Sequence, residues 1–108
     1  MAINKYSVVE SQNIQLGQGG SAFLDTTDAY TPPSGMKIIM ITMLTDVEFN
    51  TLTPEDVNIN FGTTAASPGT NGSTLTNADT FPGGVTIFGR WNNVKLQTAG
   101  DKVLLYFG

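Results

Sequence analysis

The stretch Val85–Phe107, VTIFGRWNNVKLQTAGDKVLLYF, decides the fold class, because turn signals divide it into short runs rich in β-branched and aromatic residues. Such runs are typical of strands. We predict three strands in this stretch, at Val85–Arg90, Asn93–Gln97 and Lys102–Phe107. Ala99-Gly100-Asp101 predicts the last tight turn, since glycine tolerates a positive φ. Tyr106 and Phe107 point to opposite faces of the last strand, so we expect one in the core and the other against a neighbour or a sheet partner.

Upstream, short apolar runs also alternate with Gly, Pro, Asn and Thr, and no segment has the 3.6-residue periodicity of a helix. Further strands are predicted at Lys5–Leu16, Ser21–Leu24, Met36–Leu52 and Val57–Phe61. The longest, Met36–Leu52, is apolar on both parities in its first half, which predicts burial on both sides. In its second half Val47 and Phe49 point to one side. Asp46 and Glu48 point to the other.

The segments between these strands are predicted to be turns and loops. Turns are expected at Gly17–Gly20 and Thr53–Asp56, and a loop at Asp25–Gly35, whose paired prolines exclude a helix or a central strand. Gly62–Asn77 is a long loop or loose hairpin that contains a type I′ turn signal, Asn71-Gly72. Because loops this long are uncommon in compact domains, its part from Thr63 to Asn77 is interpreted either as a contact surface or as a mobile tip.

A length of 108 residues fits one domain, which we place at 1–108, since no repeat or linker interrupts the chain. The predicted fold class is all-β, a single-domain antiparallel β-sandwich that is jelly-roll-like. The first residues lack the apolar region of a secretory signal, and the longest apolar run, Ile38–Leu44, is too short to span a membrane. We therefore expect a protein that is made and used in water, or that leaves its cell by a route other than secretion.

The composition argues against catalysis and against most ligands. The chain has no cysteine and no histidine, which removes thiolate chemistry, the usual neutral-pH general base and the commonest metal ligand. The net charge is −4 and only 13% of the residues are charged, so the five scattered basic residues do not form a nucleic-acid-binding face. We expect no enzyme activity and no cofactor, metal, nucleic acid, membrane or small-molecule substrate. The weakly charged surface suits packing against other protein.

Two groups of carboxylates were weighed as sites. They are Asp25 with Asp28, and Asp46 with Glu48 near Glu55 and Asp56. The first group offers too few oxygens for calcium and is interpreted as a solvated turn. The second resembles the carboxylate pair of a glycoside hydrolase, but a single Trp gives little for a sugar cleft. It is interpreted as an exposed strand face.

Four residues are candidates for an interface: Tyr30, Arg90, Trp91 and Tyr106. Trp and Arg are favoured anchors of protein interfaces. Trp is also a common core residue, and an arginine can stack on it, so both roles stay open for Trp91. Tyr30 lies beside the Pro-Pro loop.

The C-terminal segment Phe81–Gly108 resembles the closing segment of small bacteriophage virion structural proteins. In those proteins a Thr-Ile-x-Gly-Arg-Trp strand leads to a Gly-Asp turn and a last strand. The matching residues are Thr86, Ile87, Gly89, Arg90, Trp91, Gly100, Asp101, Tyr106 and Gly108. The resemblance covers about a quarter of the chain and carries no catalytic residue. It implies a compact β-sandwich displayed in many copies on a virus particle, and it leaves open whether the position is on the capsid or the tail.

From this resemblance we expect a capsid decoration (cement) protein of a tailed bacteriophage. Its partners would be itself, as a homotrimer, and the major capsid protein, in a virion assembled in the host bacterial cytoplasm. Multivalent binding would make weak contacts strong. Met1–Gln12 either adds a strand to a neighbour by β-augmentation or is an ordinary edge strand. The alternatives are a receptor- or glycan-binding module of a tail fibre or tail tip, and a small polysaccharide hydrolase.

Overall fold

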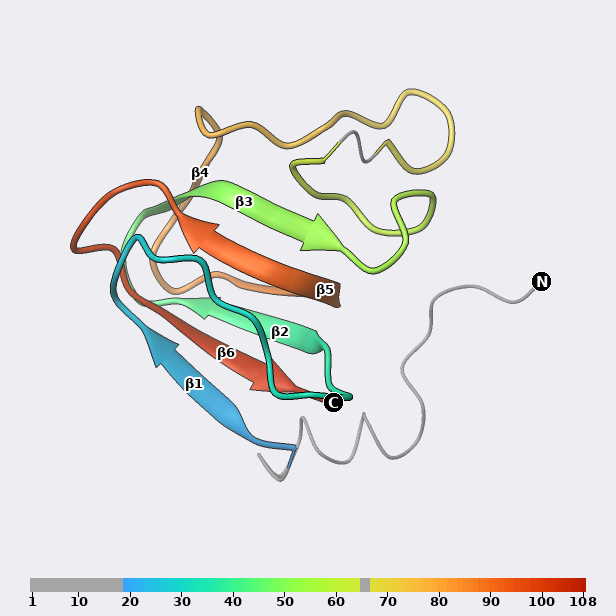
Figure 1. Cartoon of the computed structure of the whole chain (residues 1–108). Helices are drawn as coiled ribbons and strands as arrows, with labels where there is room; N and C mark the ends of the chain where they lie inside the picture. Colours follow the sequence, from blue (N-terminus) through green and yellow to red (C-terminus); the bar gives the residue numbers. More distant parts are fainter. Residues whose placement is uncertain (1–18, 65–66) are drawn as a thin grey trace.

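The computed structural model describes residues 19–64 and 67–108, so the predicted strand Lys5–Leu16 and the segment Met1–Gln12 lie outside the described residues. The described chain has no helix and six strands, β1 Ser21–Leu24, β2 Ile38–Met43, β3 Val47–Pro54, β4 Thr80–Phe81, β5 Thr86–Leu96 and β6 Val103–Phe107. Figure 1 shows the sheet, whose strand order is β1-β6-β2-β5-β3-β4. Every pairing is antiparallel. The all-β antiparallel fold class is therefore confirmed.

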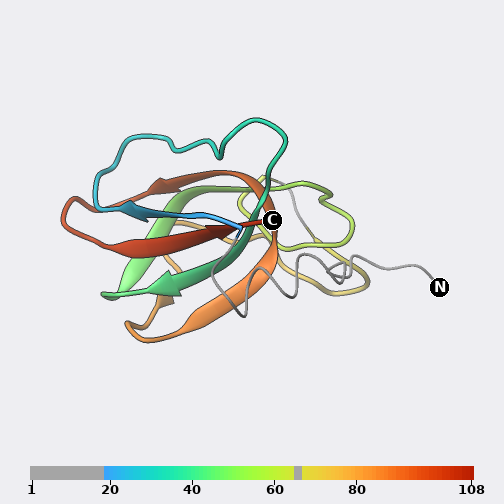
Figure 2. The same cartoon turned by 90° about the horizontal axis from the view of Figure 1, so that it is seen from below.

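Strand β5 joins the two halves of the sheet. Its first half pairs with β2, with Ile87 opposite Ile41, and its second half pairs with β3, with Val94 opposite Leu52. Trp91 stands at the change of partner, where it is opposite both Ile38 and Pro54. Figure 2 shows that the sheet is curved. All six strands thus belong to one hydrogen-bonded sheet, rather than to the two sheets that the sandwich prediction expected.

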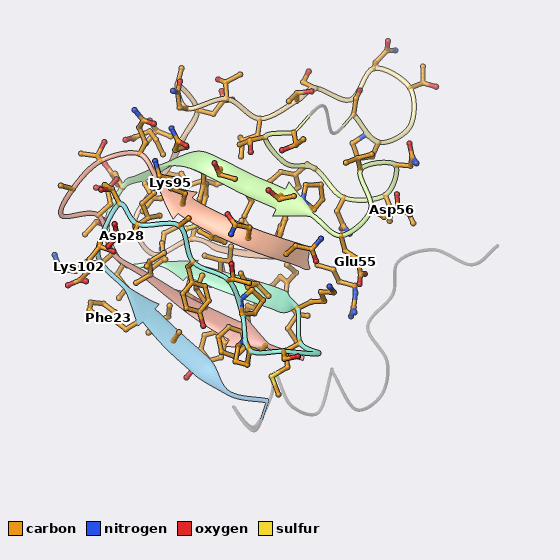
Figure 3. All side chains as sticks on the ribbon, viewed as in Figure 1. Phe23, Asp28, Glu55, Asp56, Lys95 and Lys102 are labelled. Carbon is orange, nitrogen blue, oxygen red and sulfur yellow. The ribbon has the colours of Figure 1, made fainter. Side chains whose placement is uncertain are left out.

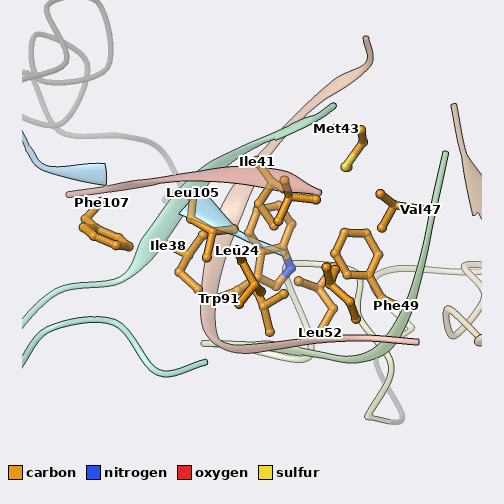
Figure 4. Packing of buried hydrophobic residues seen from close by; sticks show 13 residues of the cluster. Leu24, Ile38, Ile41, Met43, Val47, Phe49, Leu52, Trp91, Leu105 and Phe107 are labelled. Atoms are coloured by element: carbon orange, nitrogen blue, oxygen red, sulfur yellow. The ribbon is translucent and has the colours of Figure 1, made fainter. Parts of the chain in front are cut away.

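The core fills the concave side of this sheet. Alternate residues of the strands point into it, as the two-residue period of a strand requires. Its buried members are Leu24, Ile38, Ile41, Met43, Val47, Phe49, Leu52, Trp91, Val94, Leu96, Val103, Leu105 and Phe107. Figure 4 shows Trp91 in the middle of this cluster. The burial of Phe107, with Tyr106 half-buried on the other side of β6, confirms the predicted opposition of these two residues.

The predicted long strand Met36–Leu52 is wrong, because the chain forms two strands, β2 and β3, that lie on either side of β5. The break is a corner at residues 44–46. The Leu44 amide donates to the Lys102 carbonyl, and the Lys102 amide donates to Thr45 Oγ1 at 3.1 Å. The Asp46 carboxylate accepts from the Gly83 amide at 2.9 Å. These bonds take the chain out of the sheet, and the apolar pattern on both sides of the corner hides them in the sequence.

The strands predicted at Val85–Arg90 and Asn93–Gln97 are one continuous strand, β5. The predicted gap at Trp91 and Asn92 therefore lies inside the strand. Here the backbone stays paired on both edges: Thr53 is opposite Asn93 on one side, and the Tyr30 backbone bridges Val94 on the other. The last predicted strand and its turn are confirmed as β6 and a turn in which Gly100 has a φ of 94°.

The strand predicted at Val57–Phe61 is also wrong, because these residues form a turn. The amides of Ile59 and Asn60 donate to the Asp56 carbonyl, and the Asp56 carboxylate accepts from the Asn58 amide at 2.9 Å. This Asx-type capping outcompetes strand pairing. The Asn71-Gly72 type I′ turn is not formed either, since only Asn71 of the two has a positive φ. The strand Ser21–Leu24 and the loop Asp25–Gly35 are confirmed, and 62–64 with 67–77 contain no strand.

Candidate interaction surface

One face of the sheet, opposite the core, is covered by apolar side chains. It is formed by β1, β6, β2 and the first half of β5, whose inward residues are buried while the alternate residues are exposed or half-buried. We call outer face the eight alternate residues that the strand registers place side by side, which are Ser21, Phe23, Met40, Thr42, Thr86, Phe88, Leu104 and Tyr106. Arg90 follows Phe88 at the same parity of β5 and lies at the rim of this face. Two of its residues, Phe23 and Phe88, are exposed, and the apolar side chains of Met40, Leu104 and Tyr106 between them are half-buried.

The strand registers arrange the outer face in two rows. One row across β1, β6, β2 and β5 holds Ser21, Tyr106, Met40 and Phe88. The other holds Phe23, Leu104, Thr42 and Thr86. Phe88 ends the first row on β5, and Phe23 ends the second row on β1, so the two phenylalanines lie at diagonally opposite corners. The other two corners hold the small hydroxyl residues Ser21 and Thr86.

The outer face is partly exposed, and its eight residues are uncharged. Phe23 is 54% exposed and Phe88 is 55% exposed, and Figure 3 shows Phe23 on the outside of β1. The two threonines hydrogen-bond to one another, with Thr42 Oγ1 and Thr86 Oγ1 3.1 Å apart, so each supplies the other with a polar partner. None of the eight residues carries a charge. The face is thus suited to burial against another apolar surface.

Trp91, predicted as either an interface anchor or a core residue, is a core residue with no exposed surface. Its Nε1–H donates to the Phe61 carbonyl at 3.0 Å, and its ring meets the Phe61 ring edge-on at 5.6 Å between centroids. Gly89 provides the space for the ring, because a Cβ there would lie 2.7 Å from the Trp91 Cζ2 atom. A side chain buried in this way cannot contact a partner, so Trp91 is corrected from the interface candidates to the core.

Arg90 lies at the rim of the sheet and is held by Glu55. Its Nε–H donates to Glu55 Oε1 at 2.8 Å, with the two side chains 19% and 36% exposed. This hydrogen bond lowers the pKa of the Glu55 carboxyl, and the positive charge of Arg90 lowers it further. The pair joins the end of β3 to β5, which gives Arg90 a structural role in addition to any contact with a partner.

The two tyrosines among the interface candidates, Tyr30 and Tyr106, lie on different surfaces. Tyr30 stacks on Phe107, with ring centroids 6.1 Å apart and planes 8° apart, and burial raises the pKa of its hydroxyl. It closes one side of the core by pairing its backbone with Val94. Tyr106 lies in the outer face, next to Met40. Of the four predicted interface residues, only Tyr106 therefore belongs to the apolar outer face.

The carboxylates weighed as a hydrolase site have local structural partners. Glu48 accepts from Thr80 Oγ1 at 2.9 Å and Asp46 accepts from the Gly83 amide. Asp101 lies near both: burial raises its pKa, and the negative charges of Glu48 and Asp46 raise it further. Its Oδ2 is buried and accepts no hydrogen bond from the part of the chain that the structure describes.

The other carboxylates lie apart from that group. Figure 3 shows Glu55 and Asp56 beyond the end of β3, with Asp28 elsewhere. In the Asp25–Gly35 loop, the Asp28 amide donates to Thr26 Oγ1 at 3.4 Å, a local turn contact. Within 19–64 and 67–108, no three such groups converge as metal ligands would.

Sequence reasoning missed Phe23, Phe88 and Leu104 as surface residues. Phe23 alternates with the buried Leu24, and Leu104 alternates with the buried Leu105. This alternation indicated in part that Phe23 and Leu104 point away from the core. The missing information was the strand order, because only the pairing of β1 with β6 and of β2 with β5 brings these residues together.

In the described residues there is no helix of the length and apolarity needed to cross a membrane. Comparison with known proteins identifies no matching family, no curated sequence and no solved structure that resembles this chain.

Proposed function

We propose that the chain is a non-enzymatic structural protein of a virus particle, most specifically a capsid decoration protein that joins an assembled shell in many copies. One observation carries the proposal: the sheet has an outer face of eight uncharged residues, two of them phenylalanines that are about half exposed. A solvent-exposed face of this composition is typical of proteins that function in an assembly. The resemblance of the C-terminal segment Phe81–Gly108 to phage virion proteins is the reason for proposing a virus particle as the assembly.

The size of the apolar contact favours many weak contacts over one strong contact. A phenylalanine has about 200 Å² of surface, so half-exposed Phe23 and Phe88 offer roughly 100 Å² each. At about 25 cal/mol per Å², burial of both contributes about 5 kcal/mol. Association of two proteins costs about 4–15 kcal/mol in lost freedom of motion. A single contact of this kind is therefore weak, and repetition over a particle would make it effective.

The carboxylates support a structural role in the same way. Glu48 and Asp46 accept hydrogen bonds from Thr80 and Gly83, which tie β3 to the β4 region. Carboxylates held in this way serve to fasten loops. In this proposal Asp46 and Glu48 stabilise the fold, and the apolar residues of the outer face bind the assembly.

The test is co-sedimentation of the purified full chain with empty phage shells and, separately, with host cells. Sedimentation with shells alone supports the proposal. Binding to cells but not to shells contradicts it and favours a receptor-binding module of the tail. Hydrolysis of capsule polysaccharide that is lost in Glu48→Gln also contradicts it, because the chain would then be an enzyme.

A matched pair of variants connects the result to the outer face. Phe23→Ser removes an exposed aromatic ring from the face, whereas Ile59→Ser removes a 44% exposed apolar side chain from the turn after β3. We expect weaker sedimentation with shells for Phe23→Ser and no change for Ile59→Ser. Equal loss in both variants would mean that general hydrophobicity, and not this face, causes the binding.

A further inference from the structure

We propose that Asn71 is a site of spontaneous deamidation, and that the loop around it slows this reaction while the protein is folded. The inference is independent of the proposed function, because it concerns the loop at residues 67–77 and not the outer face. Three observations on this loop lead to it: the exposed Asn-Gly pair, the backbone conformation of Asn71, and the contacts that hold Gly72.

The sequence makes Asn71 the most reactive asparagine of the chain. In deamidation, the backbone nitrogen of the following residue attacks the side-chain amide carbon of asparagine and closes a five-membered ring. A side chain on the following residue hinders this attack, and glycine has none. Asn71 is the only asparagine of the sequence that glycine follows. Asn71 and Gly72 are both exposed, so water and hydroxide reach the site.

The reaction needs no reagent other than water. The backbone nitrogen of Gly72 loses its proton to hydroxide and attacks Cγ of Asn71, which forms an N–Cγ bond. The Cγ–Nδ2 bond breaks, and the amide nitrogen takes a proton from water and leaves as ammonia. Water then opens the cyclic imide. Opening at Cγ gives aspartate, and opening at the backbone carbonyl gives isoaspartate. Either product adds one negative charge to the net charge of −4.

The backbone conformation of Asn71 opposes the attack in the folded chain. Its φ of 67° lies in the left-handed region, where ψ is about 47°. At that ψ the Gly72 nitrogen lies on the opposite side of the Cα–C bond from the Asn71 side chain. The ring can close only when the nitrogen and the side chain lie on the same side. The peptide between Asn71 and Gly72 must therefore rotate before the reaction can start.

Two contacts of Gly72 resist this rotation. Ser67 Oγ donates to the Gly72 carbonyl at 2.6 Å, which closes the loop. Gly72 also lies against the backbone of Pro68, since a Cβ at position 72 would be 2.5 Å from the Pro68 carbonyl oxygen. Because Gly72 is held in both ways, the attack requires local opening of the loop.

The isoaspartate product is expected to keep the loop open. Its main chain contains one more carbon atom between residues 71 and 72, so the Gly72 carbonyl no longer lies at the same distance from Ser67. The aspartate product has the normal main chain and can close the loop again. Deamidation would therefore convert a closed loop into an open one in a single irreversible step.

The first experiment follows aspartate and isoaspartate at every asparagine of the full chain by peptide mapping and mass spectrometry, at mildly alkaline pH. We expect Asn71 to react before any other asparagine. It should react roughly tenfold or more faster in guanidinium chloride than in buffer, because the loop is open in the unfolded chain. No reaction at Asn71 in guanidinium chloride overturns the site. Equal rates in both solvents overturn the protection by the loop.

A second experiment uses a matched pair of serine variants. Ser67→Ala removes the hydroxyl that holds Gly72, whereas Ser73→Ala removes a hydroxyl from an exposed serine next to the pair. Loss of one hydrogen bond should speed the reaction of the folded chain about three- to tenfold in Ser67→Ala. Ser73→Ala should react at the parent rate, and in guanidinium chloride all three chains should react equally fast. Circular dichroism confirms that each variant is folded. An unchanged rate in Ser67→Ala, or equal acceleration in both variants, contradicts the role of this bond.

Limited proteolysis tests the open state of the product. A sample that has been converted to isoaspartate should be cut within residues 67–77 faster than the variant Asn71→Asp, which carries the same charge without the additional carbon atom. Equal rates of cleavage in the two samples would show that the loop closes again, and would refute the irreversible opening.

Discussion

The replacement Gly89→Ala tests whether the core depends on the contact between Gly89 and the Trp91 ring. A Cβ at position 89 would lie 2.7, 2.8 and 3.2 Å from three atoms of that ring, closer than packed carbon atoms allow. The ring has little freedom to move, because it is fully buried and its Nε1–H donates to Phe61. The added methyl group must therefore displace either the ring or β5.

The expected cost follows from these contacts. Overpacking a core by one methyl group costs about 1–3 kcal/mol, and a weakened hydrogen bond of the indole adds about 1 kcal/mol. Replacing glycine by alanine in the unfolded chain returns about 0.4–1 kcal/mol. We expect a net loss of about 1–3 kcal/mol in the free energy of unfolding, which lowers Tm by roughly 5–20 °C at this chain length.

Urea and thermal unfolding followed by circular dichroism measure this loss. The chain has one tryptophan, so the fluorescence of Trp91 reports the same site without interference. Its emission should shift to longer wavelength in the folded variant. In the background of Trp91→Phe, whose ring is smaller, Gly89→Ala should cost clearly less. A variant that is as stable as the parent chain, with unchanged emission and no coupling to position 91, would refute the reasoning.

Three further predictions concern charges and hydroxyl groups. Glu55→Gln should lower the free energy of unfolding by only about 0.5 kcal/mol at neutral pH, because the pair with Arg90 is partly exposed. Since the folded-state pKa of Glu55 is lowered, this loss should vanish as the pH falls through that pKa. Urea titrations at several pH values measure it. Asp101→Asn should stabilise the chain at neutral pH, because the raised pKa of Asp101 means that folding disfavours the charged carboxylate. Thermal scans should show that this gain in stability disappears at acidic pH, where the carboxyl is protonated in both the folded and the unfolded state. The double variant Thr42→Val with Thr86→Val should keep the stability within about 1 kcal/mol and strengthen association with shells, as co-sedimentation would show, because both hydrogen-bonding partners are replaced together.

Local sequence patterns predicted the fold class, and they predicted individual strands well where the bounds of a strand do not depend on its neighbours in the sheet. The last strand, its glycine turn and the short strand Ser21–Leu24 were all predicted within one residue of their bounds. In each case the alternation of apolar residues and the turn residue are contained in the segment itself. These are the parts of a β-protein that depend least on tertiary contacts.

The errors have a common cause, which is that polar side chains form hydrogen bonds that end or replace a strand. Met36–Leu52 reads as one strand because the residues that bend it, Lys102 and Gly83, lie far along the chain. Val57–Phe61 alternates like a strand, but the Asp56 side chain caps a turn there. Hydrophobic periodicity contains neither contact.

The candidate surface was the least predictable part. Trp91 was the strongest interface residue by type, yet the bend of β5 and the absence of a side chain at Gly89 place it inside. The outer face required the neighbours of four strands to be known. Residue type indicates which side chains favour contact, and only the strand order indicates which of them share a surface.

The order of the strands also dictates when the protein can begin to fold during synthesis. Of the five pairings in the sheet, four involve β5 or β6, and the fifth joins β3 only to the two residues of β4. Residues 19–85 alone would therefore have almost no sheet to form. Apart from the short contact between β3 and β4, backbone pairing of the described strands must wait until residues 86–107 have been made, which exposes the early strands to other chains in the meantime.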